Sequence, residues 1–141
     1  SYMLEDFTGR PDIAVFLDIF PAHMDWHGSF ENYLRAKKRI TARQNSKDTF
    51  IFGGRFESLK KIARDTEAKT VSLGELRWLH HDKIWFYNGD EKLFDTSAVR
   101  IIGPHNLDNI LAVLAVARVL GISADIVEGV VRSFSGLPHR L

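Results

Sequence analysis

The stretch Ile13-Ala14-Val15-Phe16-Leu17-Asp18-Ile19, which Pro11-Asp12 introduces, decides the fold class. It is a nearly continuous apolar run, and such runs are typical of strands that are buried on both faces of a parallel sheet. A polar loop at 21–28 follows, and Ser29 is then a residue type that caps helices. Strand, loop and helix in this order form the first half of a strand–helix–strand unit.

The same alternation continues downstream. Residues 49–52 with Gly53-Gly54 behind them predict a second strand and a turn, a helix is expected over about 57–65, and residues 70–73 predict a third strand. The segments 83–87 and 91–94 flank Asn88-Gly89-Asp90, and Asn-Gly is a strong hairpin signal. Two apolar helices are expected last, from Asn106 to about Leu120 and from Ser123 to near Gly136. The pattern predicts an α/β fold, with a mostly parallel sheet flanked by helices and decorated by a β-hairpin.

Composition bounds the function. The 141 residues are 45% hydrophobic and 26% charged, which suits one ordinary globular domain. The absence of cysteine excludes disulfides, thiolate metal sites and a cysteine nucleophile. Nineteen basic against eighteen acidic residues give a net charge of +1, so no electrostatic footprint for nucleic acid or an acidic membrane is expected. The apolar stretches are too short and too broken for a membrane span.

The first candidate site is His23-x-Asp25-x-His27, in the loop after the first strand. Ligands of open α/β sheets bind beyond the carboxyl ends of the strands, so a site is expected here. Two imidazoles and a carboxylate could hold a divalent cation. The spacing equally suits loop side chains that make turn and cap hydrogen bonds.

The second candidate is Lys37, on the apolar face of the helix that follows this loop. A lysine in that position usually extends its ammonium to water. The alternative is a buried lysine that is deprotonated or covalently modified.

The third candidate is 103–109, where a polar cluster opens an apolar helix. N-capping explains it, and so does a nucleotide or phosphate contact, because a helix N-terminus presents free N–H groups. Asn106 and Asn109 lie one turn apart, so both can face one ligand. His80-His81-Asp82 and the turn with an exposed cation at 136–140 are weaker signals, and the chain contains neither GxxxxGK[ST] nor GxGxxG.

Five segments, taken in order, resemble the Mur ligase family, and in particular its members that add D-glutamate. They are 1–5 (Ser-Phe-Gln-Leu-Glu in the family), 21–29 (Pro-Asp-His-Leu-Asp-x-His-Gly-Ser), 36–40 with Gln44 (Ala-Lys-x-x-Ile), 103–109 (Gly-x-His-Asn-x-x-Asn) and 134–140 (Phe-x-Gly-Leu-Pro-His-Arg). The resemblance spans the whole chain. It implies the family's central, ATP-binding domain over 1–135 and a hinge to a further domain at 136–141.

The resemblance implies an ATP-dependent amide ligase that joins D-glutamate to UDP-N-acetylmuramoyl-L-alanine through an acyl phosphate, in cytoplasmic peptidoglycan synthesis. The implied cofactors are ATP and two Mg²⁺ ions, which neutralise phosphoryl oxygens. His23 would be a metal ligand, and Lys37 would carry a carbamate that holds the second ion. The implied nucleotide contacts are His105, Asn106, Asn109 and Arg140.

Three residues depart from the family pattern. Ala22 stands where an acidic residue is usual, Asp18 where Asn is common, and Met3 where a substrate-site Gln is usual. They bear on substrate contacts and metal affinity.

The resemblance also places the phosphate-binding loop, a catalytic Glu and a uridine-nucleotide domain before Ser1, and an amino-acid-binding domain after Leu141. We therefore expect these 141 residues alone to show no ligase activity and little ATP affinity. We also expect unpaired sheet edges that favour a dimer.

Two other classes of protein stay open on the residues alone. One is a stand-alone hydrolase with a metal at His23, Asp25 and His27, although the sequence offers it no clear general base. The other is a non-catalytic interaction module that keeps a ligase-like shell, which Ala22 and Met3 make plausible.

Overall fold

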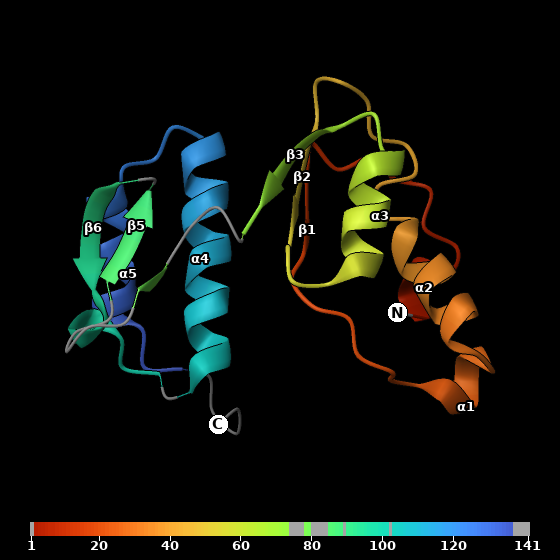
Figure 1. Ribbon diagram of the computed structural model, residues 1–141, viewed down its shortest axis with the longest axis horizontal. Helices are drawn as coiled ribbons and strands as arrows, with labels where there is room; N and C mark the ends of the chain where they lie inside the picture. The colour runs from red at the N-terminus through yellow and green to blue at the C-terminus, as the bar shows by residue number, and fades with distance from the viewer. Residues whose placement is uncertain (1, 74–77, 80–84, 89, 102, 137–141) are drawn as a thin grey trace. The chain divides into compact units, whose positions relative to one another are not determined.

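The computed structural model describes residues 2–73, 78–79, 85–88, 90–101 and 103–136 (Figure 1). Its contacts divide the chain into two compact units, Ser1–Val71 and Ser72–Leu141. The expected division into 1–135 and 136–141 stays a prediction.

The first unit is built on a sheet of three strands in the order β1-β2-β3. β1 and β2 run parallel, with Ile13 opposite Thr49 and Phe16 opposite Phe52. The elements, in chain order, are η1 (Tyr2–Leu4), β1 (Ile13–Phe16), α1 (Met24–His27), α2 (Phe30–Lys38), β2 (Thr49–Phe52), α3 (Glu57–Asp65) and β3 (Lys69–Ser72). The mixed α/β class is confirmed, and so are the strand at 49–52 and the helix at 57–65.

The core of this unit lies between the sheet and the helices α2 and α3, which Figure 1 shows beside it. Phe50 and Phe52 stack with ring centroids 5.6 Å apart, and Phe50 is completely buried. Tyr33 of α2 belongs to the same apolar cluster, as do Leu59 and Ile62 of α3. All four β2 residues are buried, whereas β1 alternates between half-buried and buried positions. Burial on both faces is therefore complete in β2 and partial in β1.

β1 ends at Phe16, three residues earlier than the apolar run predicts. Its partner β2 ends at Phe52, and the Gly53 N–H donates to the Phe16 carbonyl at 3.0 Å as the chain turns away. Gly53 passes so close to β1 that an added Cβ would lie 1.9 Å from the Leu17 carbonyl oxygen. Beyond Phe16, β2 therefore offers β1 no further partner.

A buried glutamine joins the starts of β1 and β2. Gln44 Nε2 donates to the carbonyls of Pro11 (3.0 Å) and Thr49 (3.1 Å). One side chain thus links the beginnings of the two strands. It also gives a hydrogen-bond partner to carbonyl groups whose burial without one would destabilise the fold.

The expectation of a loop over 21–28 is wrong in one respect, because Met24–His27 form the one-turn helix α1. Left-handed residues bound it, His23 at φ 55° and Gly28 at φ 70°. The Ser29 cap is confirmed, since its side chain accepts from the Asn32 N–H at 3.2 Å and opens α2.

The second unit contains a sheet in the order β4-β5-β6. Its elements are β4 (Trp78–Leu79), β5 (Trp85–Asn88), β6 (Glu91–Asp95), η2 (Thr96–Ala98), α4 (Pro104–Val119) and α5 (Ala124–Ser133). The predicted hairpin is confirmed, since β5 and β6 are antiparallel and Asn88 pairs with Glu91. The sequence did not predict β4, which is only two residues long.

Helix α4 begins two residues earlier than expected, at Pro104, with Gly103 at the N-cap position. Proline suits the first helical position because its missing N–H would lack a helical partner there. Gly103 has φ 109°, which few other residues adopt. Asn106 therefore lies in the first turn and does not open the helix.

Within the described part of the chain, no helix combines the length and the apolar character that a membrane crossing requires. β1 and β3 are the outer strands of the sheet in the first unit. Pairing of a second copy at these strands stays a prediction.

Two exposed ion pairs on α2 and α3 predict a pH dependence of stability. A hydrogen bond from Arg64 (2.8 Å) lowers the pKa of Glu57, and one from Lys38 (2.7 Å) lowers the pKa of Asp65. A carboxyl group with a lowered folded pKa stabilises above its unfolded pKa, and this contribution is lost as the pH falls through the folded value. Thermal melting of the double variant Glu57→Gln, Asp65→Asn should fall below wild type at pH 7, and the difference should shrink as the pH falls below the ordinary pKa of a carboxyl group. A gap that stays constant over this range would contradict the assignment.

Candidate functional site

The candidate site of the first unit lies where β1 ends and the chain turns through α1 into α2. His23 is exposed and occupies the left-handed region, one residue before α1. Its carbonyl accepts from the N–H groups of Trp26 (3.1 Å) and His27 (3.0 Å). Non-glycine residues in this region are uncommon and cluster at functional positions. That a ligand binds after this strand stays a prediction.

Lys37 lies on the inner side of α2, as its sequence position predicted. It is half-buried, and its ammonium lies 4.8 Å from the centre of the Phe16 ring and 5.3 Å from that of Tyr33. Phe16 is the last residue of β1, so the lysine nitrogen lies at the carboxyl end of that strand. Two aromatic faces hold a cation here, in a setting that favours it electrostatically.

His27 is buried, with its side chain 1% exposed. Its Nδ1 lies 3.1 Å from Glu5 Oε1, and the same carboxylate oxygen accepts from the Trp26 indole N–H at 3.2 Å. The ring meets Tyr33 edge to face at 5.5 Å. No local pattern in the sequence predicts Glu5 or Tyr33 as partners of this histidine.

The residues His23, Asp25 and His27 do not form a metal site. Asp25 is exposed while His27 is turned into the protein. In the part of the chain that the structure describes, no three His, Asp or Glu side chains are grouped as metal ligands. The hydrolase alternative is therefore not favoured.

A separate candidate site is the start of α4, in the second unit. Asn106 and Asn109 lie on one face, and the Asn109 amide donates to Asn106 Oδ1 at 3.3 Å. His105 is exposed, and a Cβ added at Gly103 would lie 2.6 Å from its ring. The structure thus brings the two asparagines together, as their spacing predicted. Their contact with a nucleotide stays a prediction.

Arg140 and the cluster His80-His81-Asp82 lie outside the described residues, so their predictions are untested. The three departures from the family pattern fall in different environments. Met3 is 79% exposed, Asp18 is exposed, and Ala22 packs against the core of the first unit.

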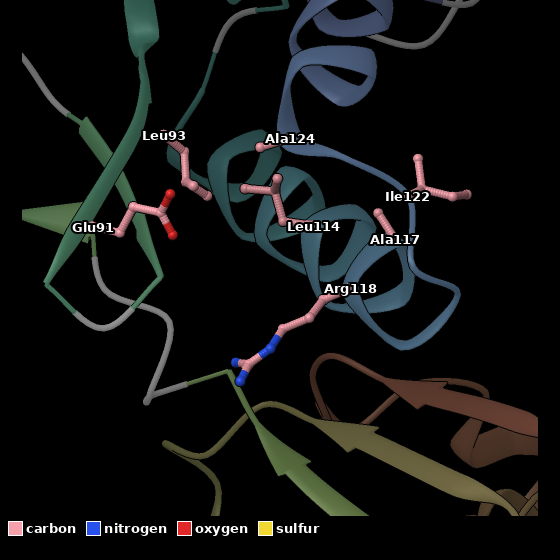
Figure 2. A pocket seen from close by; sticks show the side chains of 7 residues that line it. All are labelled: Glu91, Leu93, Leu114, Ala117, Arg118, Ile122 and Ala124. Atoms are coloured by element: carbon pink, nitrogen blue, oxygen red, sulfur yellow. The ribbon is translucent and has the colours of Figure 1, made fainter.

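The second unit also contains a hollow of about 260 Å³ that the sequence did not predict. It lies between β6, the C-terminal half of α4 and the start of α5 (Figure 2). Leu93, Leu114 and Ala124 form part of an apolar lining, with the charged side chains of Glu91 and Arg118 beside it. Among the described residues, none of the sites predicted from sequence lines this hollow.

The chain has a mixed α/β fold, and polar and basic side chains lie where the parallel strand β1 leads into the helices α1 and α2. The sequence model of the Mur ligase middle domain matches residues 3–117. The chain therefore belongs to the Mur ligase family.

The curated relatives and solved structures agree with this assignment. The chain is 35% identical over 137 residues to the UDP-N-acetylmuramoylalanine–D-glutamate ligase of Leuconostoc mesenteroides, a match that covers 94% of this chain and 30% of that protein. It is similar in fold to MurF from Acinetobacter baumannii, with a TM-score of 0.73 at 21% identity over 94% of this chain and 31% of that one. It is also similar to the Thermotoga maritima MurF ligase in complex with ADP, with a TM-score of 0.68 at 25% identity over 93% and 32%. The chain spans about 30% of the length of the curated relatives that it matches.

Proposed function

We propose that the chain is the greater part of the central, ATP-binding domain of an amide ligase that joins D-glutamate to UDP-N-acetylmuramoyl-L-alanine. The relative from Leuconostoc mesenteroides supports this choice of substrates, because its match extends over 94% of the chain. The ADP complex of the Thermotoga maritima relative supports ATP as the cofactor.

The observation that carries the proposal is the position of Lys37. Its amine lies at the carboxyl end of β1, against Phe16 and Tyr33, in the part of an α/β sheet where ligands bind. The neutral form of an amine is the form that adds CO₂, so carbamylation of Lys37 requires that its amine first loses a proton. The resulting carbamate would place a negative oxygen donor where the unmodified chain has a cation.

The proposed reaction has two steps, phosphoryl transfer and amide formation. A carboxylate oxygen of UDP-N-acetylmuramoyl-L-alanine attacks the γ-phosphorus of ATP, so the bond to the β-phosphate oxygen breaks and ADP leaves. The amine of D-glutamate then attacks the acyl carbon, loses a proton and expels phosphate. Such phosphoryl transfer is catalysed mainly by positioning and by charge stabilisation.

Mg²⁺ bound at this site would neutralise phosphoryl oxygens. The donors of this chain suit it in part, since Mg²⁺ typically takes one or two carboxylate-like ligands and completes its shell with water and substrate phosphate. His23 and a carbamate on Lys37 are the two donors that we assign to two such ions. His105, Asn106, Asn109 and Arg140 would orient the nucleotide.

We further propose that a phosphate-binding loop and an amino-acid-binding domain belong to the complete protein, and that the protein is cytoplasmic. The 141 residues alone would then bind ATP weakly and catalyse no ligation.

The test is the ligation reaction of the protein expressed from the complete reading frame that contains these residues. ADP formation should require both UDP-N-acetylmuramoyl-L-alanine and D-glutamate, and mass spectrometry should detect the amide product. L-Alanine in place of D-glutamate serves as the matched control and should give no product. Absence of ligation with D-glutamate, or ligation with L-alanine in its place, would refute the proposal.

A further inference from the structure

A series of side-chain contacts links the N-terminal segment to Lys37. It begins at Glu5, whose Oε1 lies 3.1 Å from His27 Nδ1. The His27 ring packs against Tyr33, and the Tyr33 ring in turn lies 5.3 Å below the Lys37 ammonium. Glu5 is 40% exposed in its side chain, whereas His27 is 1% exposed and Tyr33 is buried. The two residues in the middle of this series, His27 and Tyr33, are therefore held in place by packing.

The backbone of His27 adds two further constraints. Its N–H donates to the His23 carbonyl at 3.0 Å, and its carbonyl accepts from the Asn32 side-chain amide at 2.9 Å. The first bond ties His27 to the residue just before α1, and the second ties it to the first turn of α2. His27 is thus bonded both to His23 and to α2, the helix that carries Lys37.

We propose that His27 is a positioning residue, which fixes the Lys37 amine relative to His23 through Tyr33 and through the backbone of α1. The proposal rests on the proposed function, because it assigns His27 a role in the chemistry of Lys37. A lysine has a long, flexible side chain, so its amine keeps one place only if the surfaces beneath it are fixed. Tyr33 is one of those surfaces, and His27 together with Glu5 prevents its ring from shifting.

Two variants distinguish the contribution of the His27 ring from that of its Nδ1 atom. His27→Phe keeps an aromatic edge against Tyr33 and loses the Glu5 contact. His27→Asn loses the ring and keeps a polar side-chain group near the place of Nδ1. Arg35→Gln is the matched control, since Arg35 is an exposed residue of the same helix α2.

The experiment uses the complete protein and two readouts. The first is kcat and the KM for ATP in the ligation assay, corrected for the folded fraction. Loss of a residue that orients a reacting group typically lowers activity about 10- to 100-fold, so this drop in kcat is expected for His27→Phe, with KM changed less than about twofold. His27→Asn should recover part of the loss, and Arg35→Gln should match wild type.

The second readout does not require activity. Lysines are dimethylated with ¹³C-formaldehyde in CO₂-free buffer, and the Lys37 signal is assigned by its loss in Lys37→Arg. The rings of Phe16 and Tyr33 should shift this signal away from those of exposed lysines, and His27→Phe should move it back toward them. Arg35→Gln should leave it unchanged.

The outcomes distinguish this proposal from the proposed function. If wild-type protein catalyses no ligation but the Lys37 signal moves in His27→Phe, the function fails and the positioning role stands. An unchanged Lys37 signal in His27→Phe overturns the positioning role whatever the activity is. Unchanged kcat in an active enzyme overturns it too. If His27→Phe does not fold, the same two readouts on His27→Asn decide, with a shifted Lys37 signal supporting the proposal.

Discussion

Replacing Lys37 by methionine in the complete protein is expected to lower kcat for ligation about 100- to 1,000-fold, the range found when one group that stabilises transition-state charge is removed. Methionine keeps an unbranched chain that can pack between Phe16 and Tyr33 but has no amine to modify. The variant should therefore lose catalytic rate and not stability, and its melting temperature should change little.

Lys37→Arg sharpens this prediction. Arginine retains a cation that can stack on both rings, yet its guanidinium stays protonated and does not form the carbamate. We expect it to be as inactive as Lys37→Met. Lys38→Ala is the matched control, because Lys38 is the next residue and pairs only at the surface with Asp65, with both side chains nearly half exposed. Its activity should equal wild type, and full activity in Lys37→Arg would show that the positive charge, and not a carbamate, is what Lys37 supplies.

Gly53→Ala is expected to destabilise the fold by about 3 kcal/mol, at the upper end of the range for inserting one carbon into a well-packed place. The added Cβ would lie 1.9 Å from the Leu17 carbonyl oxygen and 3.0 Å from its carbonyl carbon. These are backbone atoms, so relief requires β1 and β2 to move apart just where the Gly53 N–H bonds Phe16. Urea denaturation at neutral pH measures the difference.

Gly129→Ala is the control for this substitution. Gly129 lies inside helix α5, and nothing lies within 4 Å of the place where its Cβ would be. Alanine there should stabilise by up to about 1 kcal/mol, because glycine is a poor residue in a helix interior. Equal stability of Gly53→Ala and wild type would mean that β1 and β2 are not in such close contact.

Local signals predicted much of the secondary structure. Gly53-Gly54 follow the strand-forming tetrapeptide 49–52, and the structure ends β2 accordingly. The hairpin followed from Asn88-Gly89, and the start of α2 followed from Ser29. Lys37 was placed on the inner face of its helix by spacing alone, and the rings of Phe16 and Tyr33 confirm that position.

The features that were missed depend on tertiary contacts or on very short segments. The end of β1 is set by its partner strand, which the apolar run 13–19 cannot show. One turn of helix at Met24–His27 carries too few residues for a periodic pattern. The contact between Glu5 and His27 joins residues 22 apart, and no local spacing predicts it. The positioning role that we propose for His27 therefore rests on tertiary contacts and not on a sequence pattern.

The most direct test is to replace the matched middle segment of the Leuconostoc mesenteroides ligase by these 141 residues and to measure D-glutamate ligation. This chimera asks whether a domain with Met3, Asp18 and Ala22 at the departing positions still supports catalysis. We predict ATP-dependent formation of the D-glutamate amide well above background, and its loss when Lys37→Met is introduced into the chimera. A chimera that melts cooperatively, binds both substrates and still forms no product would contradict the assignment and favour a non-catalytic module.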